Sequence, residues 1–204
     1  MKKLLVLLTL TCFASSAFAI NDTGTNSLGV YFDPDFNQNC IDYTPSVPFP
    51  VYFVMANCSE EAVGGYEFAW AMDPDPVGQY FVLSTVLPPY ALNIGDNFNL
   101  IVGIGAPYLT DTATVLVQFS MMVLTPGITA DITVGPSVPA SIEGETAFVS
   151  GESVLFPMNY STFDGEFVTR DAEGWVRPGI GNIGCPAPIA IEKQSWGNVK
   201  ALFQ

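Results

Sequence analysis

The segment Gly64–Asp73 alternates strictly between large and small side chains and is the strongest constraint on the fold. In an extended strand, its large side chains share one face and its small ones share the other with Glu67. The large ones are Tyr66, Phe68, Trp70 and Met72. Asp73-Pro74-Asp75-Pro76 follows, and proline lacks the N–H that a sheet ladder requires. The pattern predicts a β-strand that packs its aromatic face on a core.

Other segments also predict strands, two of them by the same alternation (Asn97–Gly105 and Thr112–Leu124), and turn signals recur at the spacing typical of sandwiches and barrels. Between them lie proline-rich and glycine-rich turns, and no sustained helical period appears before the C-terminus. We therefore expect an all-β fold, an antiparallel β-sandwich. From Gly135 to Gly184 the pattern is looser and predicts short edge strands or ordered loop. The expected strands are Leu28–Phe32, Val51–Ala56, Tyr80–Leu87, Asn97–Gly105, Thr112–Leu124, which should be the longest, and Gly127–Val134.

The N-terminus has the features of a secretory signal. Lys2 and Lys3 precede an apolar run, and Ala17-Phe18-Ala19 supplies the small residues that a signal peptidase needs. Acylation at Cys12 fits poorly because threonines precede it. We expect residues 1–19 to be removed, residues 20–184 to form one sandwich domain and residues 185–204 to form a tail. The predicted location is outside the cytoplasm: extracellular, periplasmic or on the outer surface. No later run approaches the ~20 apolar residues of a membrane helix.

The charge distribution is one-sided. Residues 20–169 contain 17 carboxylates and no lysine or arginine. Such a surface repels nucleic acid and anionic lipid, because both need cations on the protein to neutralise phosphates. Acidity of this kind also keeps an exported protein soluble. We therefore expect no nucleic-acid partner and no membrane span.

Three cysteines remain after the predicted cleavage: Cys40, Cys58 and Cys185. In an exported chain at least two should be oxidised. A Cys40–Cys185 bridge would tie the two ends of the domain together, and we favour it; Cys40–Cys58 is the main alternative. A zinc site is disfavoured because the chain contains no histidine and no Cys-x-x-Cys pair.

Most catalytic chemistry is excluded by composition. Without histidine, neither a Ser-His-Asp nor a Cys-His site can form. A carboxylate pair of the glycosidase type remains the alternative, an extracellular carboxylate-dependent hydrolase. Glu67 is the first candidate, although on an outward strand face it is expected to be solvated. We expect no catalytic residues and no enzyme activity.

Two further kinds of site can be drawn from the sequence. Asp33 with Asp35, and Asp73 with Asp75, flank prolines and are candidate calcium ligands, because carboxylates two apart on a rigid turn can converge on a hard cation. The same dipeptides are also ordinary turn formers. No other cofactor is expected. Rings near loops could stack on a sugar or a partner: Tyr80, Tyr90, Tyr108 and Trp175.

The order of several segments resembles the cohesin-type sandwich. Pro50–Val54 and Gly65–Trp70 are strands of that order, Asp73-Pro74 is its corner, and Val115–Ser120 is its long later strand. The resemblance covers about Pro50 to Leu124. It implies an immunoglobulin-like or jelly-roll sandwich, similar to some carbohydrate-binding modules, that acts without catalysis in extracellular assemblies. No partner-binding residue can be transferred.

The ending Trp196-Gly197-Asn198-Val199-Lys200-Ala201-Leu202-Phe203 is similar to the C-termini of many uncharacterised exported proteins of environmental bacteria. That resemblance implies a sorting or anchoring signal. The alternative is a short terminal helix or strand that docks its apolar side chains on the domain. Together, these observations predict a secreted or cell-surface binding module for an extracellular protein or glycan.

Overall fold

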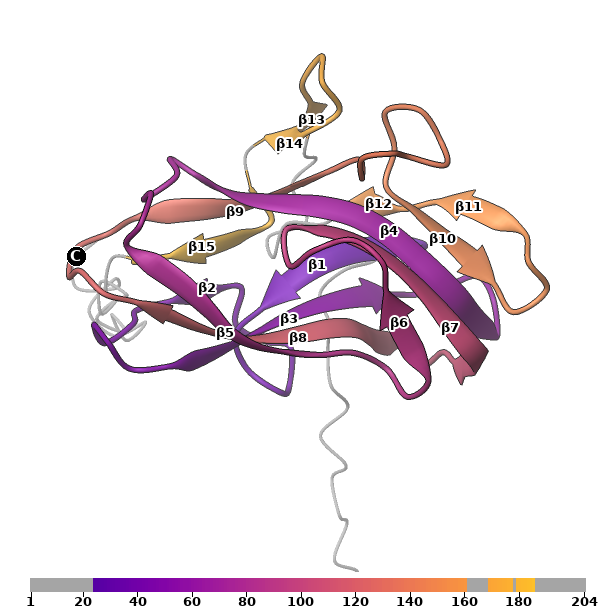
Figure 1. The fold of residues 1–204 in the computed structure, drawn as a ribbon, viewed down its shortest axis with the longest axis horizontal. Helices are drawn as coiled ribbons and strands as arrows, with labels where there is room; N and C mark the ends of the chain where they lie inside the picture. The colour runs from indigo at the N-terminus through magenta and orange to yellow at the C-terminus, as the bar shows by residue number, and fades with distance from the viewer. Residues whose placement is uncertain (1–23, 161–168, 178, 186–204) are drawn as a thin grey trace, which may run out of the picture.

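Two β-sheets face each other across an aromatic core in the computed structural model, which describes residues 24–160, 169–177 and 179–185 (Figure 1). All regular secondary structure within these residues is β-strand. The predicted all-β sandwich is confirmed, and most of its strand pairs are antiparallel; β1–β12 and β15–β2 are short parallel pairs. None of the described residues forms a helix with the length and apolar character needed to cross a bilayer.

The first sheet has the strand order β12–β1–β3–β8–β5. Its centre is the pair β3 and β8, which run antiparallel along their whole length. The strands are β1 (Ser27–Tyr31), β3 (Phe49–Ala56), β5 (Tyr80–Val86), β8 (Ala113–Val123) and β12 (Asn159–Tyr160).

The second sheet is built around β4 (Ala62–Asp73), the longest strand. One edge of β4 pairs with β7, which pairs in turn with β6. The other edge of β4 pairs with two strands in succession, β10 along its first half and β9 along its last. β11 pairs with β10, β15 pairs with β9, and β2 pairs with β15. The other strands of this sheet are β2 (Cys40–Ile41), β6 (Ala91–Asn93), β7 (Asn99–Leu109), β9 (Ala130–Gly135), β10 (Ala147–Ser150), β11 (Leu155–Pro157) and β15 (Gly181–Ile183), and a separate hairpin has β13 (Thr169–Arg170) and β14 (Val176–Arg177).

The predicted aromatic face of β4 lies in the core. Phe68 and Trp70 are almost fully buried and stand within 5.2 and 5.7 Å of the Phe53 ring, measured between ring centroids. The Trp70 indole N–H donates to the Asn97 carbonyl at 2.6 Å, so the ring is buried with its polar atom satisfied. Burying such a side chain contributes roughly 1.5–3 kcal/mol. This face therefore joins the two sheets.

The strict alternation expected for Thr112–Leu124 is wrong at one point. Leu116 and Val117 are adjacent in the chain, yet both are fully buried. The register of β8 with β3 shifts there, because Phe53 pairs with Val117 while Val54 pairs with Val115. A β-bulge thus moves the inward positions by one residue, and Val115 is only half-buried. The prediction that this strand is the longest is also wrong, because β8 has 11 residues and β4 has 12.

The segment after Gly135 pairs more fully than edge strands would. β10 lies between β4 and β11, so it is an interior strand. Phe148 on β10 is fully buried and stacks on Phe156 of β11 at 5.3 Å. The sequence signal was weak because these strands are short, with glycine and proline close by.

The favoured disulfide, Cys40–Cys185, is confirmed, with a Cα–Cα separation of 5.9 Å. It joins Cys40, the first residue of β2, to Cys185, which follows β15 by two residues, and β2 and β15 also pair with each other. Cys58 is free and half-buried, and burial raises the pKa of its thiol. The predicted signal peptide and the tail from residue 186 onward lie outside the described residues.

Candidate functional site

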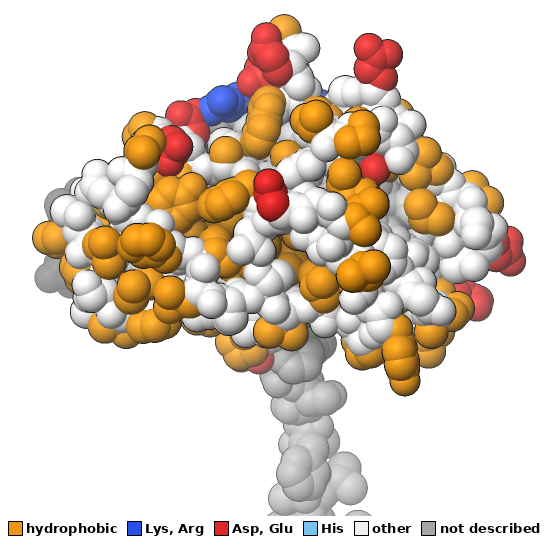
Figure 2. All heavy atoms as spheres, viewed as in Figure 1, with side chains coloured by type: hydrophobic (Ala, Val, Ile, Leu, Met, Phe, Trp, Pro, Cys, Tyr) orange, Lys and Arg blue, Asp and Glu red, His pale blue; other side chains and the backbone are white. Residues whose placement is uncertain are grey.

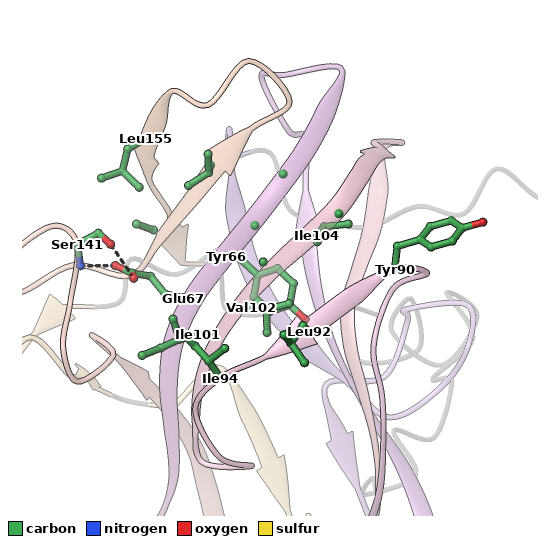
Figure 3. Close-up of a pocket in the computed structure, with 16 residues that line it drawn as sticks. Tyr66, Glu67, Tyr90, Leu92, Ile94, Ile101, Val102, Ile104, Ser141 and Leu155 are labelled. Carbon is green, nitrogen blue, oxygen red and sulfur yellow. Dashed lines mark hydrogen bonds between the residues drawn. The ribbon is translucent and has the colours of Figure 1, made fainter.

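A hollow of about 640 Å³ lies on the outer face of the second sheet, over β4, β6, β7, β10 and β11 (Figure 3). Side chains on this face alternate with those of the core, and here most of them are aliphatic. They are Leu92 and Ile94 from β6 and the turn after it, Ile101 from β7, Val149 from β10 and Leu155 from β11. Leu92 and Ile94 are 68% and 74% exposed. Together with the other aliphatic side chains of the hollow they form one contiguous exposed apolar surface, the kind of surface that marks an interaction site.

Glycines shape the floor of the hollow. Gly65 of β4 and Gly103 of β7 are paired across the ladder, so two adjacent strands lack a side chain at the same level. A Cβ on Gly103 would meet no atom within 4 Å, which places open space directly above it. A Cβ on Gly65 would stand 2.6 Å from the Val102 carbonyl oxygen, so this glycine is required by the approach of β7.

The loop between β9 and β10, residues 136–146, forms a wall of the hollow. It crosses the outer face of β4 to reach β7, where Val138 and Asn99 exchange two hydrogen bonds of 2.8 Å. The loop then returns to β10. Between these two points, the loop places Ser141 over Glu67. A second, smaller hollow of about 360 Å³ lies between the loop and the turn after β6. Ile94, Ile101, Glu67 and Ser141 line both hollows, so the two are continuous.

Glu67 is buried, which corrects the expectation of a solvated carboxylate. Only 7% of the residue is exposed. Its two carboxylate oxygens accept hydrogen bonds from the Ser141 backbone N–H at 2.5 Å and from the Ser141 hydroxyl at 2.9 Å (Figure 3). The residue does project from the outer face as predicted, but the loop covers it. The two partners are 74 residues apart, and no local sequence pattern signals such a contact.

Glu67 is also the one carboxylate among the residues that line the main hollow. No described cation pairs with it. Arg170 pairs with Glu145 and lies over the Tyr160 ring, and Arg177 pairs with Asp73 and Asp171. Glycoside hydrolysis requires two facing carboxylates, and the hollow supplies one.

Two of the four candidate calcium ligands have other partners in the structure. Asp33 accepts hydrogen bonds from the backbone N–H groups of Asn37 and Gln38 at 2.9 and 2.7 Å, and Asp73 is paired with Arg177. Asp35 and Asp75 are exposed. Within the described ranges, no three acidic or cysteine side chains gather in an arrangement that could hold a metal ion. Calcium binding by these residues stays a prediction.

The four rings near loops have different surroundings. Tyr80 is half-buried and packs edge-on against Phe98 at 6.2 Å, and burial raises its pKa. Trp175 is half-buried and covers Gly135, and Tyr108 is half-buried as well. Tyr90 is 81% exposed at the rim of the hollow, and its ring points away from the aliphatic side chains (Figure 3).

The face seen in Figure 1 carries hydrophobic side chains across much of its area (Figure 2). Blue Arg side chains show only along its upper margin, and carboxylates lie mainly toward the edges (Figure 2). The scarcity of basic side chains on this face agrees with the absence of lysine and arginine from residues 20–169.

No protein-family model matches the chain, and no curated protein matches it. Among solved structures, it is similar to the sixth cohesin of Acetivibrio cellulolyticus scaffoldin B, which was determined in complex with a mutant Cel5 dockerin. The identity is 9%, the TM-score 0.46, and the match covers 66% of this chain and 93% of that one.

A type II cohesin domain from the cellulosome of the same organism gives 12% identity and a TM-score of 0.42, covering 68% of this chain and 91% of that one. A cohesin module of a Clostridium perfringens family 33 glycoside hydrolase gives 6% and 0.43, covering 66% of this chain and 91% of that one. At these values the similarity does not assign the chain to a family.

Proposed function

We propose that the protein is a non-catalytic binding module, secreted or held at the cell surface, whose outer hollow on the second sheet binds a protein partner. The observation that carries this proposal is the hollow itself, with exposed Leu92 and Ile94 facing Leu155 across a floor of glycine. A soluble chain rarely leaves such a concave aliphatic surface uncovered unless it binds something there.

Protein is the better candidate than glycan. Sugar recognition relies on aromatic faces and on several convergent polar groups. The hollow has aliphatic walls, and Tyr90 directs its ring away from them. Aliphatic walls suit the side chains of an extended or helical peptide, which can place a Leu- or Phe-sized group in the hollow.

The charge of the surface defines the partner further. No described cation pairs with Glu67, and residues 20–169 hold no lysine or arginine. A partner that carries a lysine or arginine beside its apolar side chains would place a positive charge against this carboxylate and approach an acidic surface favourably. We therefore propose a partner segment that is apolar and basic.

The proposal of export rests on the signal-like residues 1–19 and on the Cys40–Cys185 disulfide, since disulfides persist in oxidising compartments. The carboxylate-dependent hydrolase is not favoured, because Glu67 is the one carboxylate of the main hollow.

The test is capture with matched variants. The exported chain, residues 20–204, is immobilised as wild type, as Leu92→Asp and as Val86→Asp, and is exposed to envelope proteins of the producing cell. Leu92 and Val86 are 68% and 56% exposed on strands of different sheets. We expect a captured protein to be lost with Leu92→Asp and kept with Val86→Asp, and the purified partner to bind with the same dependence. Equal capture by both variants would contradict the proposed site.

A further inference from the structure

We propose that the chain's own segment Trp196–Phe203 binds in the outer hollow in cis, with Lys200 directed toward Glu67. The inference rests on the proposed function, because it concerns the same site and names a ligand for it. A partner protein would then have to displace this segment.

The chemistry of the segment complements that of the hollow. Trp196, Val199, Leu202 and Phe203 are large apolar side chains, and Lys200 lies among them. The hollow offers aliphatic walls, an open space above Gly103 and one carboxylate. Each oxygen of Glu67 already accepts a hydrogen bond from Ser141 and still has a second lone pair for an ammonium donor.

The positions of the basic residues indicate which of them would pair with Glu67. The exported chain has four basic residues, and Arg170 and Arg177 are both engaged in ion pairs. The other two are Lys193 and Lys200, and only Lys200 has apolar residues immediately on both sides. A buried carboxylate gains from a counter-charge, because its neighbours in the hollow are mostly apolar.

The segment can reach the hollow. In the sheet, Gly181 of β15 pairs with Ile132 of β9, and Ile132 pairs with Met72 of β4. The last residue of β15 is two positions further on, so the chain leaves β15 near the level of Pro74. From that level Glu67 is seven residues back along β4, whereas Cys185 is two residues beyond Ile183 and two strands to the side. At ~3.3 Å per residue and ~4.8 Å between strands, the separation is about 31 Å. The eleven steps from Cys185 to Trp196 can span up to about 36 Å.

Tethering favours binding in cis over binding to another molecule. A segment joined by a short linker is present at an effective concentration of about the millimolar range. Even a weak contact would then be occupied in the same chain at ordinary protein concentrations.

The experiment uses a fluorescein-labelled peptide of residues 195–204 and the exported chain, residues 20–204. In the chain with Val199→Asp and Leu202→Asp the hollow would be vacated, so we expect the peptide to bind that variant at least about tenfold more tightly than wild type. Adding Gly103→Val or Leu92→Asp to the variant should weaken binding about tenfold or more, whereas adding Val86→Asp should not. A peptide with Lys200→Glu should also bind about tenfold more weakly.

Several results would overturn the inference. Equal peptide binding by wild type and by the tail variant would mean that the hollow is not occupied in cis. Insensitivity to Gly103→Val would place the peptide elsewhere. A concentration-dependent dimer of wild type that is lost in the tail variant, measured by sedimentation, would show that the segment binds a second copy. If Leu92→Asp abolishes capture of a partner while the peptide does not bind, the proposed function stands and the cis segment is excluded.

Discussion

Glu67 on β4 and Ser141 on the loop before β10 are joined by two hydrogen bonds, which fix the loop to the sheet and set one wall of the hollow. The backbone N–H of Ser141 donates to one carboxylate oxygen and its hydroxyl donates to the other. The pair therefore stabilises the position of the loop. Substitutions can distinguish the contribution of the Ser141 hydroxyl from that of the Ser141 backbone N–H.

Ser141→Ala removes the hydroxyl and keeps the backbone N–H. Because a hydrogen bond to a charged group is lost, we expect the free energy of unfolding to fall by about 1–2 kcal/mol. Glu67→Ala should cost more, since it removes both bonds to Ser141. Urea unfolding monitored by fluorescence measures both. A larger loss for Ser141→Ala than for Glu67→Ala would contradict this assignment.

The two floor glycines should respond in opposite ways to a larger side chain. Gly103→Val points into open space on a strand, where a β-branched residue is favoured, so stability should stay constant or rise by about 0.5–1 kcal/mol. Gly65→Val would force the Val102 carbonyl aside and should cost roughly 1–3 kcal/mol. Thermal unfolding distinguishes them. Because Gly103→Val fills the hollow of a stable protein, it also tests binding without a folding defect.

Loss of the Cys40–Cys185 bridge should be strongly destabilising. The two residues are 145 positions apart, and in the chain-entropy model a loop of that length contributes about 5 kcal/mol. The double variant Cys40→Ala with Cys185→Ala should show this loss in urea, whereas Cys58→Ala removes a half-buried free thiol and should change stability far less. Thiol labelling of the unfolded, unreduced exported chain should find one reactive cysteine.

Tyr66 should make the free energy of unfolding decrease as the pH rises into the alkaline range. Its hydroxyl is buried and donates to the Leu116 carbonyl at 2.5 Å, and burial, with a smaller contribution from Tyr108, raises its pKa far above the ordinary value. Above about pH 10 the unfolded chain loses this proton and the folded one keeps it, so the unfolded state binds fewer protons and stability falls as pH rises.

Tyr66→Phe removes this proton. At neutral pH we expect it to cost about 1 kcal/mol through the lost hydrogen bond. Between pH 10 and 11.5 its stability should fall less steeply than that of wild type, by up to about 1.4 kcal/mol per pH unit. Urea titrations at several pH values give both slopes. Parallel slopes would show that Tyr66 is deprotonated in the folded state as readily as in the unfolded one.

The parts of the fold that depend on local pattern could be predicted from the sequence. Tyr66, Phe68, Trp70 and Met72 alternate with small residues, and the structure buries all four. The Cys40–Cys185 pair followed from the position of each cysteine near one end of the domain. The first feature depends only on neighbouring residues, and the second on the few ways in which three cysteines can pair.

The hollow could not be predicted, because it arises from contacts between distant segments. Gly65 and Gly103 become neighbours only through the pairing of β4 with β7. Glu67 is buried only because Ser141 crosses above it. The bulge at Leu116 likewise depends on the register with β3, which leaves no mark in the alternation of β8 itself.

The succession of β9 and β10 along one edge of β4 has an evolutionary consequence. Their connecting loop begins and ends on the same edge, so residues could be inserted at its tip without disturbing any strand register. Lengthening or shortening it would raise or lower one wall of the hollow while the sandwich stayed the same. Relatives of this protein could therefore acquire different ligands through changes in the length of one loop, and we expect sequence length to vary most between Pro136 and Thr146.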